Sequence, residues 1–160
     1  MNEHKRDLIV IALVLVLILS AGLISSKQNK KLEKGDLLEV TLVNSQEKQV
    51  KIFADVADNQ SELEKGLSGR SKIQDDRGMI FIFPEENILT FWMKEMKFPL
   101  DMIFFDSQFN IVDINENAQP CKTIRECPIY PSKKPARYVL EINAGLARKN
   151  NLKIGDKAIV

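Results

Sequence analysis

The N-terminal part of the chain is dominated by an apolar run from Leu8 to Ile24, in which 15 of the 17 residues are hydrophobic. A run without a polar face makes a poor helix for a soluble domain. As a helix it extends about 25 Å, and the uncharged Ser25 and Ser26 bring it close to the roughly 30 Å hydrocarbon core of a bilayer. We therefore expect one transmembrane helix, with residues 1–26 forming a short N-tail and a membrane anchor.

A cleaved signal peptide is the alternative to this anchor, because the tail before the run is short and charged. Signal peptides usually have an apolar stretch of about 7 to 15 residues followed by an A-x-A-like site, and no clean site of this kind follows here. The lysines after the run favour a cytoplasmic C-terminus, whereas long domains translocate largely regardless of flanking charge. We expect a single-pass protein of the cell membrane with an extracytoplasmic C-terminal domain, or a secreted protein if the segment is cleaved.

The remaining chain divides into a linker and one domain. Residues 27–36 are polar and basic and are expected to form the linker, which leaves residues 37–160 for the domain. The whole chain carries 23 Lys and Arg against 22 Asp and Glu. Nucleic-acid-binding domains usually carry a clear excess of basic residues. The balance of charge argues against a nucleic acid as a partner. The expected partners are the membrane and an envelope ligand or protein.

The domain is expected to be mainly β, because its apolar residues mostly recur at every second position. Strand-like runs separated by short turn signals cover residues 38–42, 50–54, 78–83, 88–93, 100–105, 111–115, 137–142 and 157–160. This rhythm is typical of a compact antiparallel β-sandwich or barrel-like domain. A long loop is expected around Pro120, Pro128, Pro131 and Pro135.

Two short helices interrupt the strands. The first is predicted over residues 58–66, with Asp58 or Asn59 as the N-cap and Gly66 as the residue that ends it. The second is predicted over residues 143–151. The fold expected from the sequence is thus a mainly β domain with two short helices, preceded by one N-terminal transmembrane helix.

Eight of the eleven aromatic residues fall between positions 81 and 109, and most of them are expected to form the core of the sheet. Adjacent residues of a strand point to opposite faces. Phe91 and Trp92 therefore cannot both face the core, and the same holds for Phe104 and Phe105. An aromatic side chain on an outer face is either covered by another element or binds something.

Several motifs together resemble one known family. They are KGLSGR at 65–70, RGMIFIFP at 77–84, FWMK followed by FPLDMIFFD within 91–106, ENAQP at 116–120, YPSKKPARYVLEINAG at 130–145 and LKIGD at 152–156. In this combination and order the chain resembles the domain of unknown function 192 (DUF192), from about Gln49 to Val160. The resemblance implies a compact β-rich sandwich or barrel that is commonly exported or anchored, and it supplies no agreed activity. The family usually continues FWMK with Asn-Thr, whereas this chain has Glu95 and Met96.

The two cysteines, Cys121 and Cys127, lie in the proline-bearing segment. Outside the cytoplasm such a pair usually forms a disulfide, and two free thiols are the alternative. A zinc site is not expected, because it needs two further ligands and the only histidine, His4, precedes the apolar run. We expect no metal and no cofactor.

Because the only histidine precedes the apolar run, the usual Ser-His-Asp and Cys-His catalytic arrangements are not expected in the domain. A pair of carboxylates could still act as in glycoside hydrolysis, and the candidates are Asp101, Asp113, Glu116 and Glu141. Acidic residues that alternate with apolar ones more often form the solvent face of a strand. Asp101 differs, because it follows a proline and begins an apolar run, and it is expected to accept hydrogen bonds from backbone amides of loops.

The candidate ligand-binding residues are Arg70, Trp92, Lys94, Asp101 and Tyr130. Trp92 and Lys94, two positions apart near a strand end, place a ring and an ammonium on one face, where a polar ligand or a sugar could stack. A partly buried tryptophan beside a solvated lysine is the alternative. Arg70 follows two glycines and is a suitable ion-pair partner for a carboxylate such as Asp101.

These observations favour a membrane-anchored extracytoplasmic domain that acts as a binding or accessory module for an envelope ligand or partner. The first alternative is an enzyme that needs no histidine and acts on carbohydrate or envelope polymer through carboxylates. The second is a purely structural envelope protein. An enzyme is the less favoured class, since no complete catalytic set is visible in the sequence.

Overall fold

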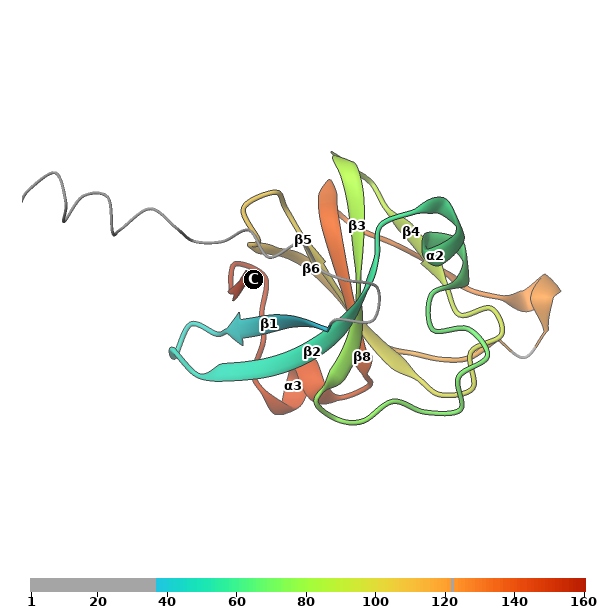
Figure 1. Ribbon diagram of the computed structural model, residues 1–160, viewed down its shortest axis with the longest axis horizontal. Coiled ribbons are helices and arrows are strands. Elements are labelled where there is room, and N and C mark those ends of the chain that lie inside the picture. Colours follow the sequence, from blue (N-terminus) through green and yellow to red (C-terminus); the bar gives the residue numbers. More distant parts are fainter. Residues whose placement is uncertain (1–36, 122) are drawn as a thin grey trace, which may run out of the picture. The chain divides into compact units, whose positions relative to one another are not determined.

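The computed structural model describes residues 37–121 and 123–160, which form a mainly β fold with two short helices (Figure 1). The strands and helices in chain order are β1 (Leu38–Val43), β2 (Gln49–Ala57), α2 (Gln60–Lys65), β3 (Arg77–Asn87), β4 (Thr90–Trp92), β5 (Leu100–Phe105), β6 (Ile111–Ala118), β7 (Ile129–Pro131), β8 (Ala136–Asn143), α3 (Leu146–Lys149) and β9 (Lys157–Ile159). A single 3-10 turn covers Ile124–Glu126. The predicted membrane segment lies outside the described residues, and within 37–121 and 123–160 no helix is long and apolar enough to cross a bilayer.

Seven strands form one sheet in the order β6-β5-β8-β3-β2-β1-β9. The sheet curls so far that the regions of its two edge strands meet at one end. The amide of Ile111, at the start of β6, donates to the carbonyl of Asp156 at 2.7 Å, and the amide of Ala158 in β9 donates to the carbonyl of Phe109 at 2.9 Å. The fold is therefore a curled half-barrel rather than a pair of separate stacked sheets.

The prediction of an antiparallel fold is wrong for one pair of strands. β2 and β3 run parallel, with Phe53 opposite Arg77 and Ala57 opposite Phe81. Parallel neighbours need a crossover of a dozen or more residues. The segment between these strands contains α2 and is long enough for that crossover, whereas the sequence pattern alone identified only a helix between two strands. The sheet is consequently mixed.

Helix α2 begins and ends as predicted. Asn59 is the N-cap, and its side chain accepts the backbone amide of Glu62 at 3.2 Å. Gly66 follows the helix with φ 47°, a backbone conformation that glycine adopts without steric cost. Its amide closes the last turn by donating to the carbonyl of Glu62. The short helix therefore stops at a defined point, and the chain turns toward the end of β4.

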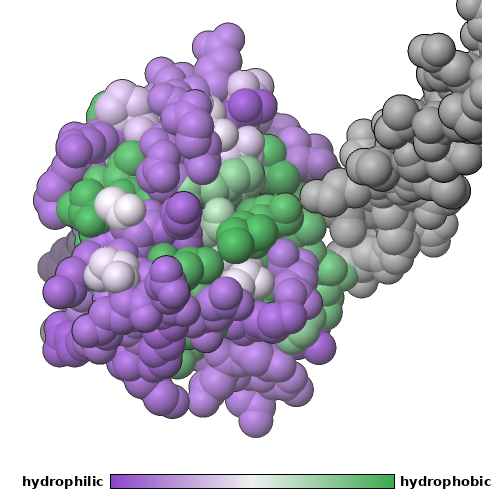
Figure 2. Space-filling view, turned by 90° about the vertical axis from the view of Figure 1, so that its left-hand side faces the viewer, coloured by the Kyte–Doolittle hydropathy of each residue, from purple (hydrophilic) through white to green (hydrophobic). Residues whose placement is uncertain are grey.

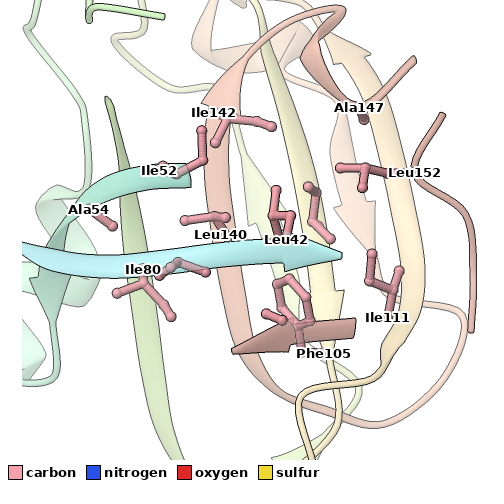
Figure 3. Packing of buried hydrophobic residues seen from close by; sticks show 13 residues of the cluster. Leu42, Ile52, Ala54, Ile80, Phe105, Ile111, Leu140, Ile142, Ala147 and Leu152 are labelled. Atoms are coloured by element: carbon pink, nitrogen blue, oxygen red, sulfur yellow. The ribbon is translucent and has the colours of Figure 1, made fainter. Parts of the chain in front are cut away.

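The central strands are buried on both faces, which produces two apolar cores. The first lies inside the curled sheet and is shown in Figure 3. Phe105 and Ile80 belong to this core, whereas their neighbours Phe104 and Phe81 belong to the second core on the other face. The prediction that Phe104 and Phe105 face opposite sides is confirmed. All six residues of β5 are buried, which explains why five of them are apolar.

A small second sheet, made of β4 and β7, lies at the second core. Phe91 pairs with Tyr130, and Trp92 pairs with Ile129. Strand β7 falls in the segment that was predicted to be a loop, because three residues that include a proline are too short to show a period. The predicted disulfide between Cys121 and Cys127 is present, with 4.7 Å between the Cα atoms. The amide of Cys121 also donates to the carbonyl of Met93, just after β4, at 3.4 Å.

Large apolar side chains that remain exposed fall into two groups along the described chain. Trp92 and Ile129 belong to the small sheet, and Ile88 lies just before it. Ile154, Ile159 and Val160 belong to the C-terminal segment. Figure 2 views the molecule from the side of the β1–β2 hairpin and shows apolar surface in the middle of that face, bordered by hydrophilic surface. Among these exposed residues, Trp92 lines a cleft.

Candidate functional site

Strand β4 directs its two aromatic side chains to opposite faces, as predicted. Phe91 packs edge-on against Phe81 and Phe104, with ring centres 5.0 and 5.9 Å away. Trp92 is 50% exposed, and it is the only aromatic residue in the exposed class within the described chain. Because the Phe91 ring fixes the strand against the second core, the Trp92 ring is held outward on a short, well-anchored element.

Lys94 lies over this ring. Its ammonium nitrogen is 5.1 Å from the centre of the Trp92 ring, within the range of a cation–π interaction. The backbone here is tied to the segment after α2, since the Ser68 hydroxyl donates to the carbonyl of Lys94 at 3.0 Å and the amide of Gly69 donates to the carbonyl of Glu95 at 3.1 Å. The Trp92 ring and the Lys94 ammonium thus lie on one face, as the sequence predicts.

A cleft of about 740 Å³ lies between α2 and the end of β4. Its polar and aromatic lining comes from Ser61, Glu64, Lys65, Ser68, Trp92, Lys94 and Glu95. The two lysines balance the two glutamates, so the cleft carries no formal net charge. Hereafter it is called the Trp92 cleft. It combines one flat apolar surface with positively charged hydrogen-bond donors and negatively charged acceptors.

A second cleft, of about 460 Å³, lies where loop 70–76 passes beside β2 and the start of β3. Its polar and aromatic lining comes from Phe53, Asp55, Arg70, Lys72, Gln74 and Arg77. A guanidinium nitrogen of Arg70 is 2.7 Å from a carboxylate oxygen of Asp55. The proposed pairing of Arg70 with Asp101 is therefore wrong, because loop 70–76 carries Arg70 to β2 instead. Hereafter this is called the Arg70 cleft.

Asp101 has a structural role at the start of β5. It is fully buried, and its two carboxylate oxygens accept the backbone amides of Asn117 at 2.8 Å and Ala147 at 2.9 Å. The expectation that it accepts amide hydrogens from loops is confirmed. These bonds join the end of β6 and the start of α3 to β5, and Asp101 lines neither cleft.

Tyr130 also lies apart from the two clefts. Its ring packs against the second core, and its hydroxyl accepts the amide of Gln119 at 3.3 Å. The five residues singled out from the sequence are thus not one site. Trp92 and Lys94 share a cleft, Arg70 lines the other, and Asp101 and Tyr130 have structural contacts.

The carboxylates considered for an enzyme are separated as well. Asp113 is buried and accepts hydrogen bonds from the amide of Lys133 at 3.0 Å and from its ammonium at 3.2 Å. Glu116 forms a surface ion pair with Arg148 at 2.9 Å. The expectation of a solvent-facing side chain holds for Glu116, but it is wrong for Asp113 and Glu141. Neither cleft contains any of the four carboxylates that the sequence suggested.

Glu141 is the most unusual of these groups. It lies on the second-core face of β8, directly between Met79 of β3 and Met102 of β5 in the register of the sheet. The residue is 5% exposed, and burial raises the pKa of its carboxyl from the ordinary 4.5 to about 8. One strand beyond Met102, the side-chain nitrogen of Asn115 is buried without a hydrogen-bond partner in the described chain.

Comparison with known proteins now settles the family. The DUF192 family model, described as an uncharacterised conserved group, matches residues 41–160. The chain belongs to the DUF192 family. The resemblance predicted from its motifs is confirmed over nearly the whole described part.

Two relatives carry the equivalent name UPF0127. One, from Pyrococcus abyssi, is 36% identical over 84 residues, which are 49% of this chain and 63% of the relative. The other, from Thermococcus gammatolerans, is 36% identical over 83 residues, which are 51% of this chain and 50% of the relative. The matched part therefore spans less than two thirds of each of these relatives.

Two solved structures share the DUF192 fold of this chain. One is described as a proposed transcription regulator from Sinorhizobium meliloti, with TM-score 0.72 and 32% identity, and the match covers 81% of this chain and 96% of that one. The other is a protein of unknown function from Novosphingobium aromaticivorans, with TM-score 0.71 and 32% identity, covering 78% and 85% of the two chains.

The Trp92 cleft is formed where two DUF192 motifs meet. Lys65 and Ser68 belong to KGLSGR, and Trp92 and Lys94 belong to FWMK. Sequence reasoning did not identify the cleft residues of α2 or Glu95 as part of a site. A helical pattern does not indicate which strand end the helix will face. The two motifs were the signal that the sequence offered, because each carries a cation outside the apolar periodicity.

The departure of this chain from the usual DUF192 motif falls on a special backbone position. Glu95 has φ 58°, in the left-handed region that few residues other than Gly, Asn and Asp adopt readily. The asparagine that the family usually has after FWMK suits this conformation. The glutamate of this chain places a carboxylate in the cleft at some steric cost.

The described residues offer little to a metal ion. Within 37–121 and 123–160, no three His, Cys, Asp or Glu side chains gather closely enough to hold one. What the two clefts offer instead is an aromatic platform in one case and a set of cations in the other.

Proposed function

We propose that this protein is a carbohydrate-binding module and that the Trp92 cleft holds the sugar. The observation that carries the proposal is the Trp92 ring, which is half-exposed beside a large cleft while the neighbouring Phe91 is packed into the core. A tryptophan left in solvent forgoes the hydrophobic stabilisation that burial would give it. An exposed apolar surface rimmed by polar groups is typical of a ligand-binding site.

The charge balance of the cleft favours a neutral ligand. Lys65 and Lys94 offset Glu64 and Glu95, and the hydroxyl of Ser61 adds a further hydrogen-bonding group. A sugar ring has an apolar C–H face that fits an indole, and its hydroxyls accept from lysines and donate to carboxylates. A strongly charged ligand would find as much repulsion as attraction here. A neutral carbohydrate therefore matches both the ring and the rim.

The place of action in this proposal is the cell envelope, with the domain tethered to the membrane through residues 8–24. Two features support it. The first is the length of the apolar run, and the second is the Cys121–Cys127 disulfide, since such bonds persist mainly in oxidising compartments. The module would thereby hold an envelope polysaccharide, or a partner carrying one, close to the membrane surface.

The first test is binding of the full-length protein, kept in a mild detergent, to insoluble chitin and cellulose as two neutral polysaccharides. We expect the protein to sediment with at least one of them, Trp92→Ala to abolish sedimentation and Trp92→Phe to retain part of it. Ile129→Ala is the matched control, because it removes another exposed apolar side chain of the same small sheet. Equal sedimentation of all variants would contradict the proposal.

An enzyme acting on the same carbohydrate is the second candidate, because two carboxylates line the Trp92 cleft. Glu64 and Glu95 thereby replace Asp101, Glu116 and Glu141 as the groups that such chemistry would use. A carboxylate pair flanking a glycosidic bond can act as acid and base or as acid and nucleophile. New reducing ends, released from soluble oligosaccharides by the natural protein and not by Glu95→Gln or Glu64→Gln, would favour this candidate over binding alone.

A further inference from the structure

The Arg70 cleft is distinct from the Trp92 cleft in both position and charge. The segment after α2 separates them, since Ser68 lines one and Arg70 lines the other. Three cations, Arg70, Lys72 and Arg77, face one lining carboxylate, that of Asp55. The formal charge of the lining is therefore +2, whereas that of the Trp92 cleft is zero. Such a difference points to a second ligand of different chemistry.

We propose that the Arg70 cleft binds a phosphate monoester. Two of its cations are already held in place without a ligand. The Arg70 guanidinium is fixed by Asp55 at 2.7 Å, and that of Arg77 lies over the Phe53 ring with its carbon 5.9 Å from the ring centre. A guanidinium has five donors, so one carboxylate leaves several of them free for a second anion. Positioned cations lose less conformational entropy on binding than mobile ones.

The third cation supplies the charge that is not yet balanced. Lys72 is exposed and has no ion-pair partner among the described residues. Asp76, which is not part of the lining, approaches Arg77 only to 4.0 Å and remains exposed. The excess of about two positive charges matches a phosphate monoester, which carries roughly −1.5 to −2 at neutral pH. A monocarboxylate would neutralise half of it.

The size of the cleft sets the class of ligand further. A volume of about 460 Å³ is large enough for a phosphate with a small organic group and lies in the range of small-molecule sites. Phe53 and Ile73 give that organic group an apolar wall. The same phosphate monoester chemistry occurs in soluble metabolites and in the headgroup of phosphatidic acid. Leu37, the first described residue, also lines this cleft, so the site lies where the predicted linker joins the domain.

The probes that separate these sources are glycerol 3-phosphate and short-chain phosphatidic acid. Each is titrated by calorimetry into the full-length protein in neutral detergent, with glycerol, acetate and short-chain phosphatidylcholine as comparisons. We expect saturable binding of a phosphate monoester and none of the three comparisons. Tighter binding of phosphatidic acid would assign the site to a lipid headgroup, and tighter binding of glycerol 3-phosphate to a soluble ester.

The matched variants are Lys72→Gln in the cleft and Lys48→Gln in the β1–β2 turn, which remove the same charge from two exposed positions. We expect the first to weaken binding at least about tenfold and the second to leave it unchanged. Equal affinity of the two variants, or acetate binding as tightly as the phosphate ester, would overturn the proposal. Because the readout uses no polysaccharide, it is independent of carbohydrate binding in the Trp92 cleft.

Discussion

The ammonium of Lys94 lies 5.1 Å from the centre of the Trp92 ring, and both side chains line the cleft beside α2. Exposed cation–π contacts contribute about 0.5–1 kcal/mol. We therefore expect Lys94→Met, which keeps an apolar stem, to lower the free energy of unfolding by no more than about 1 kcal/mol in urea titrations. Lys97→Met is the control at an exposed lysine nearby. A loss above about 2 kcal/mol would give Lys94 a structural role instead of a place in the site.

Asp101 should be far more sensitive than its exposed counterpart Glu116. Asp101 accepts two backbone amides from separate segments in a buried position, and hydrogen bonds to a charged group contribute about 1.5–3 kcal/mol each. Asparagine offers one acceptor and turns a donor toward the other amide. We expect Asp101→Asn to lower the free energy of unfolding by about 3 kcal/mol or more, and Glu116→Gln by less than about 1 kcal/mol. Similar losses for both, measured with urea, would contradict the structural role of Asp101.

Glu141 should make stability depend on pH. Burial raises its pKa to about 8, so the folded state holds the proton more tightly than the unfolded state does. The stabilisation is complete below about pH 4.5 and is lost as the pH rises toward 8, by an amount on the order of a few kcal/mol. We expect the free energy of unfolding to fall between pH 5 and pH 8, and Glu141→Gln to flatten that slope and to be the more stable protein at pH 8. The same slope in both proteins would exclude Glu141 as its source.

Replacing Glu95 by asparagine should stabilise the protein, because asparagine suits the backbone conformation at this position. With φ 58° it occupies a conformation that asparagine tolerates better than glutamate does. We expect Glu95→Asn to raise the free energy of unfolding by about 0.5–1 kcal/mol. Glu95→Gln is the control, since it removes the same charge without relieving the backbone. If thermal denaturation gives both variants the same stability, the gain would be electrostatic and the conformational explanation would fail.

Much of the fold could be predicted from the alternation of apolar and polar residues along the strands. The features that could not be predicted have physical causes. The opposite directions of Phe104 and Phe105, and of Phe91 and Trp92, were predictable because strand geometry alone determines them. The parallel pairing of β2 with β3 was not, because alternation is the same in both strand directions. Glu141 was expected in solvent for a related reason. An alternating pattern does not reveal that a second layer covers the polar face.

The candidate site was predictable only in part. Trp92 and Lys94 are close in sequence, and their common face follows from a two-residue period. Arg70 finds Asp55, a residue of another strand, through a loop whose path the sequence does not determine. The grouping of Arg70, Lys72 and Arg77 was missed for the same reason. A contact between residues close in sequence could thus be inferred, whereas contacts across the crossover needed the structure.

The most direct test of carbohydrate binding uses the fluorescence of Trp92, which is the only tryptophan in the chain. The full-length protein is titrated with soluble oligomers of N-acetylglucosamine and of glucose while the emission spectrum is recorded. A sugar stacked on the half-exposed ring would displace water from it, so we predict a saturable shift of the emission to shorter wavelength with at least one oligomer. An emission spectrum that stays unchanged with both oligomers up to millimolar concentrations would contradict the proposal that the Trp92 cleft binds a neutral carbohydrate.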